Sequence, residues 1–312
     1  MIEVTNVTKR YGEKVAVSDL TFEVRPGIVT GFLGPNGSGK STTMRLILGL
    51  DAPNAGRTLV NGKPYRDHDS PLHEAGALLE ARSVHTGRSA RNHLLALAQT
   101  HGIGRRRVDE LIESVGLREV AGKRAGGFSL GMGQRLGIAS ALLGDPRTVM
   151  FDEPVNGLDP EGIQWVRKLL QRLASEGRTV FVSSHLMSEM ALTAEHLIVI
   201  GRGKLIADMG VEEFVASASK HSVRVRSPQL ERLVELVAGP EVSVSAVAPS
   251  VVEVRGLSSE QVGTIAAEHG IVLYELSTQQ ASLEEAFMEL TRDSLEFHVE
   301  DRPKAEPNEV LT

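Results

Sequence analysis

Hydrophobic and polar positions alternate at the start of the chain and take helical spacing further on. Residues 2–4 and 21–24 alternate apolar and polar side chains, as half-buried antiparallel strands do. Short apolar runs, typical of buried strands, lie at 28–33, 148–151, 179–183 and 197–200. Helical spacing is found between and beside them, at 40–50, 92–120, 160–176 and 187–194. Strands that alternate with helices predict an α/β core with a parallel sheet between helices.

The pattern changes near residue 216. Strand, helix, strand, strand, helix and strand patterns follow, at 222–226, 229–238, 242–247, 251–254, 258–269 and 271–276. This order is that of a ferredoxin-like module, and a further helix is expected at 282–291. We therefore predict a core of residues 1–216 with a helical subdomain at about 85–145, a small α+β accessory module at 217–293, and an acidic, disordered tail at 294–312.

Composition places the chain among ordinary globular proteins. It has 312 residues, of which 41% are hydrophobic and 24% are charged, a size that indicates two domains. The absence of cysteine excludes disulfide scaffolds, thiolate metal sites and cysteine nucleophiles. No apolar run approaches the roughly 18–20 residues of a membrane-spanning helix, and no secretory signal is evident. We expect a cytoplasmic location.

Charge is spread unevenly along the chain. The net charge is −6, with −8 in residues 217–312 and +2 in the rest. An acidic C-terminal part repels phosphate backbones, and basic residues are not concentrated enough to indicate a dedicated nucleic-acid binder. No direct nucleic-acid partner is expected.

A glycine-rich loop between an apolar strand and a helix is the clearest chemical motif. It fits the phosphate-binding pattern of Gly, four residues, Gly-Lys-Ser/Thr. In such a loop, backbone N–H groups and a helix N-terminus converge on phosphate, and the lysine and serine are expected to serve the β- and γ-phosphates and Mg²⁺. The alternative, a chance glycine-rich turn, is disfavoured by the strand before it and the helix after it. The residues are Gly34, Pro35, Asn36, Gly37, Ser38, Gly39, Lys40, Ser41 and Thr42.

Two carboxylates follow the apolar run at 148–151. Ligands in a parallel sheet lie beyond the carboxyl ends of the strands, so Asp152 and Glu153 are expected at the nucleotide. Asp152 is predicted to hold Mg²⁺ through water, and Glu153 to polarise the attacking water. The alternative role for Asp152 is that of a helix cap, but two acids before Pro154 suit a metal ligand and a base better.

With further motifs, the chain resembles the nucleotide-binding subunit of ATP-binding cassette (ABC) transporters over about residues 1–216. Phe128-Ser129-Leu130-Gly131-Met132 stands in place of the family signature Leu-Ser-Gly-Gly-Gln. Gly157-Leu158-Asp159-Pro160 is similar to the D-loop, which contacts the second subunit. His185 is similar to the switch histidine and Tyr11 to the aromatic residue that stacks on adenine. Without the neighbouring motifs, His185 would be interpreted as an ordinary polar residue and Tyr11 as a residue packed on the sheet.

The resemblance implies a P-loop ATPase core with an N-terminal antiparallel sheet, and ATP and Mg²⁺ as its ligands. It implies that each site is split between two subunits, head to tail, with Ser129 and Gly131 on the other subunit's γ-phosphate. It also implies that Glu153 and His185 hold the attacking water. Because Glu153 is present, a homodimer is expected, driving a separate integral-membrane permease from the inner face of the cell membrane.

Two motifs depart from the family pattern. Leu130 and Met132 replace a glycine and the glutamine of the signature, and Glu80 stands where most members have the Q-loop glutamine. Both departures, and the segment Ser282–Phe287, resemble drug and antibiotic exporters of the bacitracin and daunorubicin type. A carboxylate at position 80 is expected to ligate Mg²⁺ and to tune coupling to the permease.

Three other functions stay open at this point. A soluble ABC ATPase acting on ribosomes or nucleic acid is disfavoured, because such members carry two cassettes or long coiled coils. A small-molecule kinase is disfavoured by the signature and the Asp159 loop, and an importer ATPase by Glu80. The transported substrate is not encoded here, because its contacts lie in the permease.

Overall fold

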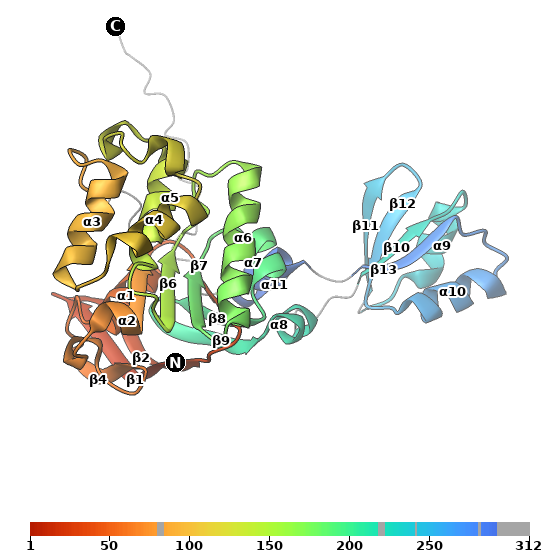
Figure 1. Cartoon of the computed structure of the whole chain (residues 1–312). Helices are drawn as coiled ribbons and strands as arrows, with labels where there is room; N and C mark the ends of the chain where they lie inside the picture. The colour runs from red at the N-terminus through yellow and green to blue at the C-terminus, as the bar shows by residue number, and fades with distance from the viewer. Residues whose placement is uncertain (80–83, 218–221, 241, 280–281, 292–312) are drawn as a thin grey trace, which may run out of the picture.

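The computed structural model describes residues 1–79, 84–217, 222–240, 242–279 and 282–291. Its centre is a six-stranded sheet with the strand order β5-β6-β7-β3-β8-β9 (Figure 1). Five strands are parallel and β9 pairs antiparallel with β8 at the edge, so the predicted parallel sheet is confirmed. The strands are β3 (Val29–Leu33), β5 (Ala75–Leu78), β6 (Thr148–Asp152), β7 (Thr179–Ser183), β8 (His196–Gly201) and β9 (Lys204–Gly210).

A three-stranded antiparallel sheet packs against one side of this centre. Its order is β2-β1-β4, formed by β1 (Ile2–Tyr11), β2 (Lys14–Val24) and β4 (Ala55–Val60). The two sheets share a core with α1 (Lys40–Ile47), in which the rings of Phe22, Phe32 and Phe181 lie 4.9–5.9 Å apart. Burial of these large side chains fixes β3, and therefore the loop that follows it.

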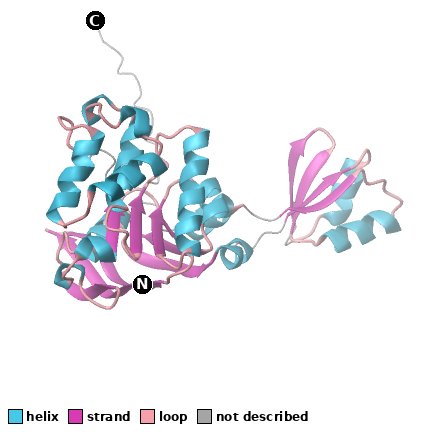
Figure 2. Cartoon of the chain, viewed as in Figure 1, coloured by secondary structure: helices cyan, strands magenta, loops and turns pink. Residues whose placement is uncertain are grey.

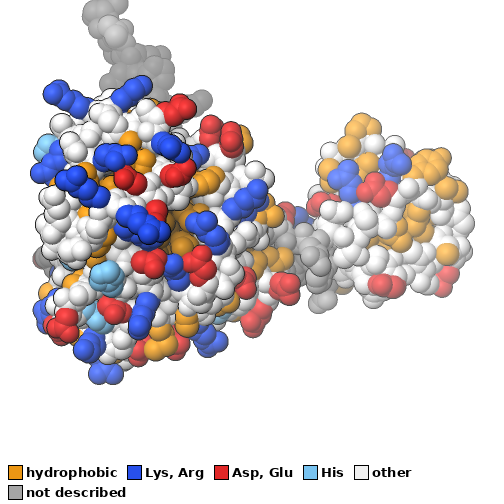
Figure 3. Space-filling model, viewed as in Figure 1, with side chains coloured by type: hydrophobic (Ala, Val, Ile, Leu, Met, Phe, Trp, Pro, Cys, Tyr) orange, Lys and Arg blue, Asp and Glu red, His pale blue; other side chains and the backbone are white. Residues whose placement is uncertain are grey.

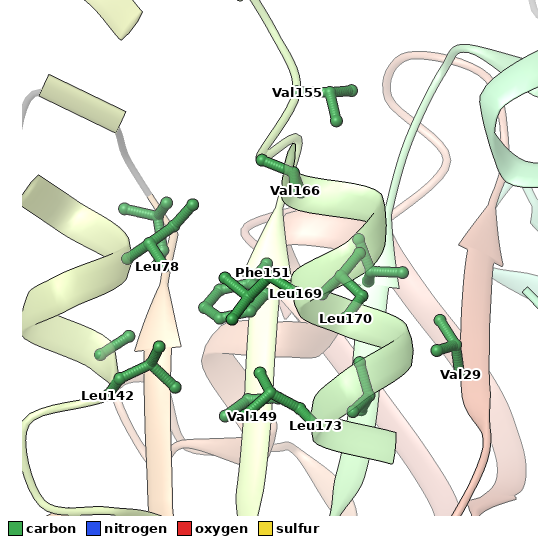
Figure 4. Packing of buried hydrophobic residues seen from close by; sticks show 14 of the residues in the cluster. Val29, Leu78, Leu142, Val149, Phe151, Val155, Val166, Leu169, Leu170 and Leu173 are labelled. Carbon is green, nitrogen blue, oxygen red and sulfur yellow. The ribbon is translucent and has the colours of Figure 1, made fainter. Parts of the chain in front are cut away.

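Helices cover the rest of the central sheet (Figure 2). Figure 4 shows Phe151 of β6 between Leu78 of β5 and Leu169 of α6, in the larger core. The predicted helical segment at 92–120 is divided into two helices, because Gly102 takes a left-handed φ of 69° between them. The helices are α2 (Pro71–Glu74), α3 (Ala90–Thr100), α4 (Arg105–Ser114), α5 (Leu130–Ala141), α6 (Pro160–Ser175), α7 (Met187–Thr193) and α8 (Val211–Ser217).

A second, smaller sheet stands apart from the first two (Figure 1). It is antiparallel throughout, in the order β11-β12-β10-β13, and confirms the predicted βαββαβ order. Two helices cover one face over a separate valine-rich core. The last strand begins at Glu275 rather than at residue 271. The elements are β10 (Ser222–Arg226), α9 (Leu230–Val237), β11 (Ser243–Ala248), β12 (Val251–Arg255), α10 (Ser259–Glu268) and β13 (Glu275–Gln279).

Helix α11 (Leu283–Thr291) does not belong to this smaller core, although the sequence grouped it with residues 217–293. It packs against α7 and α8, and Leu283, Ala286 and Phe287 are buried in the large core. By its packing, α11 therefore belongs to the large body and not to the accessory module predicted at 217–293. The predicted tail, residues 294–312, lies outside the described residues.

The surface is mixed in character. On the face in Figure 3, basic and acidic side chains are interspersed over the large body, and hydrophobic side chains are more prominent on the small one. Within the described ranges, no helix has both the length and the apolar character needed to cross a membrane.

Candidate nucleotide-binding site

The glycine-rich loop joins β3 to α1 in a conformation that requires glycine. Gly39 has a φ of 106°, and a Cβ there would lie 2.6 Å from the Ala16 carbonyl oxygen. A Cβ on Gly34 would lie 2.5 Å from the Ile200 carbonyl oxygen. No side chain caps the N-terminus of α1, and its first turn holds no acidic residue. The free N–H groups of that turn are therefore suited to an anion.

Lys40 lies beneath this loop. Its side chain is buried, and Nζ donates to the carbonyl oxygens of Gly34 at 2.6 Å and Pro35 at 3.3 Å. Burial lowers the pKa of Lys40, while the carboxylates of Glu153 and Asp152 act in the opposite direction. The loop thus holds a desolvated positive charge close to the place where its backbone N–H groups converge.

Asp152 joins the loop to two neighbouring strands. Ser41 Oγ donates to Asp152 Oδ2 at 2.7 Å, and Ser183 Oγ donates to Asp152 Oδ1. Asp152 and Ser183 are paired residues at the ends of β6 and β7. Ser183 is not among the site residues predicted from the sequence, although its place at the end of an apolar strand is a signal that points to it.

The donor set of this corner fits Mg²⁺. Ser41 and Asp152 offer hard oxygen atoms, which Mg²⁺ prefers, and Mg²⁺ usually takes one or two protein ligands together with phosphate and water. Among the residues that the structure describes, no group of three or more His, Cys, Asp or Glu side chains is placed to hold a metal alone. A cation here would therefore depend on nucleotide for its remaining ligands.

Glu153 is held in an uncommon backbone conformation. Its φ is 52°, a left-handed value that is sparsely populated by residues other than glycine. Its N–H donates to the carbonyl oxygen and hydroxyl of Ser183, at 3.3 and 3.1 Å. Its carboxylate Oε2 lies 2.6 Å from His185 Nδ1 and accepts the His185 backbone N–H at 3.3 Å. The structure thus brings Glu153 and His185 together, and strain of this kind gathers at functional sites.

Tyr11 lines the same cleft. The cleft has a volume of about 400 Å³ and is lined by Tyr11, Lys14, Ala16, residues 36–42, Asp152 and Glu153. Tyr11 is 48% exposed, and its hydroxyl donates to Asp51 Oδ2 at 3.0 Å. The cleft is therefore lined by both a half-exposed aromatic residue and the phosphate-binding loop, the two kinds of group that a nucleotide requires.

Ser129, Gly131 and Asp159 are not among the described residues that line this cleft. Ser129 Oγ accepts the Met132 N–H at 3.2 Å and caps α5, and Asp159 Oδ1 accepts the Gly162 N–H at 2.8 Å and caps α6. A Cβ on Gly131 would lie 3.1 Å from the Leu158 side chain. Glu80 lies outside the described residues. Within one chain the loop, the two carboxylates, His185 and Tyr11 are thus brought together, whereas the signature residues do not line the cleft.

Comparison with known proteins agrees with this geometry. The ABC transporter family matches residues 17–156, and a domain of unknown function, DUF8746, matches residues 221–284. The bacitracin transport ATP-binding protein BcrA of Bacillus licheniformis is 34% identical over 296 residues, covering 93% of this chain and 97% of that protein. The chain belongs to the ABC transporter ATP-binding proteins.

Further relatives support this membership. The lantibiotic transport ATP-binding protein SrtF of Streptococcus pyogenes is 34% identical over 208 residues, covering 67% of this chain and 90% of that protein. A dimeric structure of a post-hydrolysis state of the ATP-binding cassette MJ0796, bound to ADP and Pi, is 25% identical, has a TM-score of 0.62, and covers 67% of this chain and 98% of that one. The predicted ABC ATPase core is confirmed, and this ABC protein binds and hydrolyses ATP.

Proposed function

We propose that this ABC protein is the ATPase of an exporter and works as a head-to-tail homodimer. The observation that carries the proposal is that the signature does not line the cleft of its own chain. Ser129 and Gly131 do not line the cleft that holds the phosphate-binding loop. A second copy, turned head to tail, would supply them to the exposed side of the bound nucleotide.

Within each site we assign the roles as follows. Tyr11 stacks on adenine, the loop residues 34–42 hold the phosphates, and Lys40 neutralises their charge. Ser41 and Asp152 hold Mg²⁺ together with Glu80, and bound Mg²⁺ neutralises charge that develops on the transferred phosphoryl group. Asp159 contacts the second subunit.

Hydrolysis itself falls to Glu153 and His185. Glu153 accepts a proton from the attacking water, because its carboxylate lies at the same strand end as Asp152. His185 orients this carboxylate through Nδ1 and its backbone N–H. Closure of the dimer on ATP and reopening after hydrolysis then provide the two states that drive a partner.

The partner in this proposal is a separate integral-membrane permease, which places the chain at the inner face of the cell membrane. Relatives named for bacitracin and lantibiotic transport favour export of a drug, antibiotic or lipid-like compound. Co-expression with the membrane protein encoded by the neighbouring reading frame tests this step. Formation of a stable complex with altered ATPase activity supports the proposal, and a chain that stays free with unchanged activity contradicts it.

The dimer is tested by molar mass from light scattering. The variant Glu153→Gln should trap ATP, so its mass should double in ATP and Mg²⁺ and return to that of one chain without nucleotide. Adding Lys40→Ala removes the phosphate contact and should keep the mass at one chain. A Glu153→Gln protein that binds ATP and remains monomeric would contradict the head-to-tail dimer.

A further inference from the structure

A glutamine on the signature helix reaches the backbone of the general base. Gln134 lies in α5 and is only 2% exposed, and its Nε2 donates to the main-chain oxygen of Glu153 at 3.0 Å. The same oxygen accepts the N–H of Asn156 at 3.1 Å. The Glu153 carbonyl therefore keeps a hydrogen bond even without Gln134.

The other end of this amide is unsatisfied. Gln134 Oε1 is buried and has no hydrogen-bond partner among the residues that the structure describes. Turning the amide over would set two oxygen atoms against each other, so the orientation with Nε2 on the carbonyl is the favourable one. A buried polar atom without a partner is unfavourable, and an apolar side chain of the same length would avoid that cost. Stability of the fold does not explain a glutamine here.

Gln134 contacts Glu153, the residue whose backbone is strained. Glu153, with its φ of 52°, is fixed at its N–H by Ser183, at its carboxylate by His185, and at its carbonyl by Gln134 and Asn156. Ser183 and His185 both belong to β7 and the segment that follows it. Gln134 is the anchor that comes from the helical subdomain.

The signature and the loop after Glu153 are in close contact in two further places. A Cβ on Gly157 would lie 2.1 Å from Leu130 Cδ2, and one on Gly131 would lie 3.1 Å from Leu158 Cδ2. Close packing of this kind transmits displacement instead of absorbing it. A displacement of the first turns of α5 is therefore expected to displace the main chain around Glu153 as well.

We propose that Gln134 is a positioning residue for hydrolysis. It ties the main chain of Glu153 to the helix that begins at the signature, so nucleotide seated against Ser129 and Gly131 sets the Glu153 carboxylate for attack on the same chain's ATP. This inference rests on the proposed function, because it needs both the general base and the head-to-tail dimer.

The test is Gln134→Met, which keeps the length of the side chain and removes both polar atoms. We expect kcat for ATP hydrolysis to fall about 10–100-fold, as a misplaced catalytic group does, with KM changed less than about twofold. The melting temperature should stay equal or rise, because the unsatisfied oxygen is removed. Gln99→Met, the same substitution at an exposed position of α3, is the matched control and should change none of the three.

A double variant gives the second readout. Because Gln134 acts through Glu153, Gln134→Met should slow the Glu153→Gln protein by less than about twofold. Three results would overturn the inference: kcat within twofold of wild type, a loss that lies in KM, or a loss of kcat that follows a fall in melting temperature. If Glu153→Gln alone hydrolyses ATP at the wild-type rate, it is the proposed function that fails, whatever Gln134→Met does.

Discussion

Phe287 on α11 is expected to stabilise the ATPase body although it follows the smaller sheet in the chain. Its side chain is 6% exposed and lies in the large core, where α11 packs against α7 and α8. Phe287→Ala leaves a cavity at an element on the edge of that core. We expect a loss of about 3 kcal/mol, the low end for such substitutions. For a body of this size, this corresponds to a fall of roughly 6–12 °C in melting temperature.

Scanning calorimetry with and without ATP is the suitable assay. ATP raises only the melting transition of the part that binds it, so it identifies the ATPase body. We expect Phe287→Ala to lower that transition and to leave any separate transition of the smaller sheet in place. Met288→Ala, on the same helix but with a side chain that is 53% exposed, should shift neither by more than about 1–2 °C. An ATP-sensitive transition that is unchanged in Phe287→Ala would refute the docking of α11.

Three further predictions concern the nucleotide site. Because burial lowers the pKa of Lys40, its ionisation opposes folding at neutral pH, and this opposition disappears as the pH rises toward the ordinary value of 10.5. Lys40→Met should therefore lose ATP binding, yet it should be more stable than wild type near pH 7. The difference between the two denaturant midpoints should shrink at high pH, and a difference that does not change with pH would contradict this prediction. Tyr11→Ala should raise the Kd for a fluorescent ATP analogue by about 3–10-fold with little change in kcat, and an unchanged Kd would remove Tyr11 from the site. Glu80→Gln should raise the Mg²⁺ concentration needed for half-maximal hydrolysis, whereas superimposable Mg²⁺ curves would dismiss a metal role.

Local signals in the sequence predicted the parts of the site that are contiguous in the chain. The glycine-rich loop carries its own geometry, because Gly39 can take a φ that other residues resist. The apolar run before Asp152 placed that residue at a strand end. Both signals depend on a few neighbouring residues, so one sequence is enough to read them.

Contacts between segments that are far apart in the chain could not be predicted from such local signals. Ser183 reaches Asp152 only because β6 and β7 pair in one register, and Gln134 reaches Glu153 only because α5 packs beside the sheet. Strand β5 was not predicted, because its sequence Ala-Gly-Ala-Leu has no β-branched residue. Glycine is required at position 76 because a Cβ there would lie 1.8 Å from the Ala141 carbonyl oxygen. For α11, the sequence predicts a helix but does not say which core its apolar side chains join.

Single-turnover hydrolysis by Glu153→Gln tests whether Glu153 is the general base. With protein in excess over labelled ATP and Mg²⁺, the amount of bound nucleotide and the rate of phosphate formation are measured together. Glu176→Gln, at the C-terminal end of α6, serves as the matched control. If Glu153 is the general base, Glu153→Gln binds ATP as wild type does and forms phosphate about 10²–10⁴-fold more slowly, while the control is unchanged. Phosphate formation by Glu153→Gln at a rate within about threefold of wild type would show that Glu153 is not the general base.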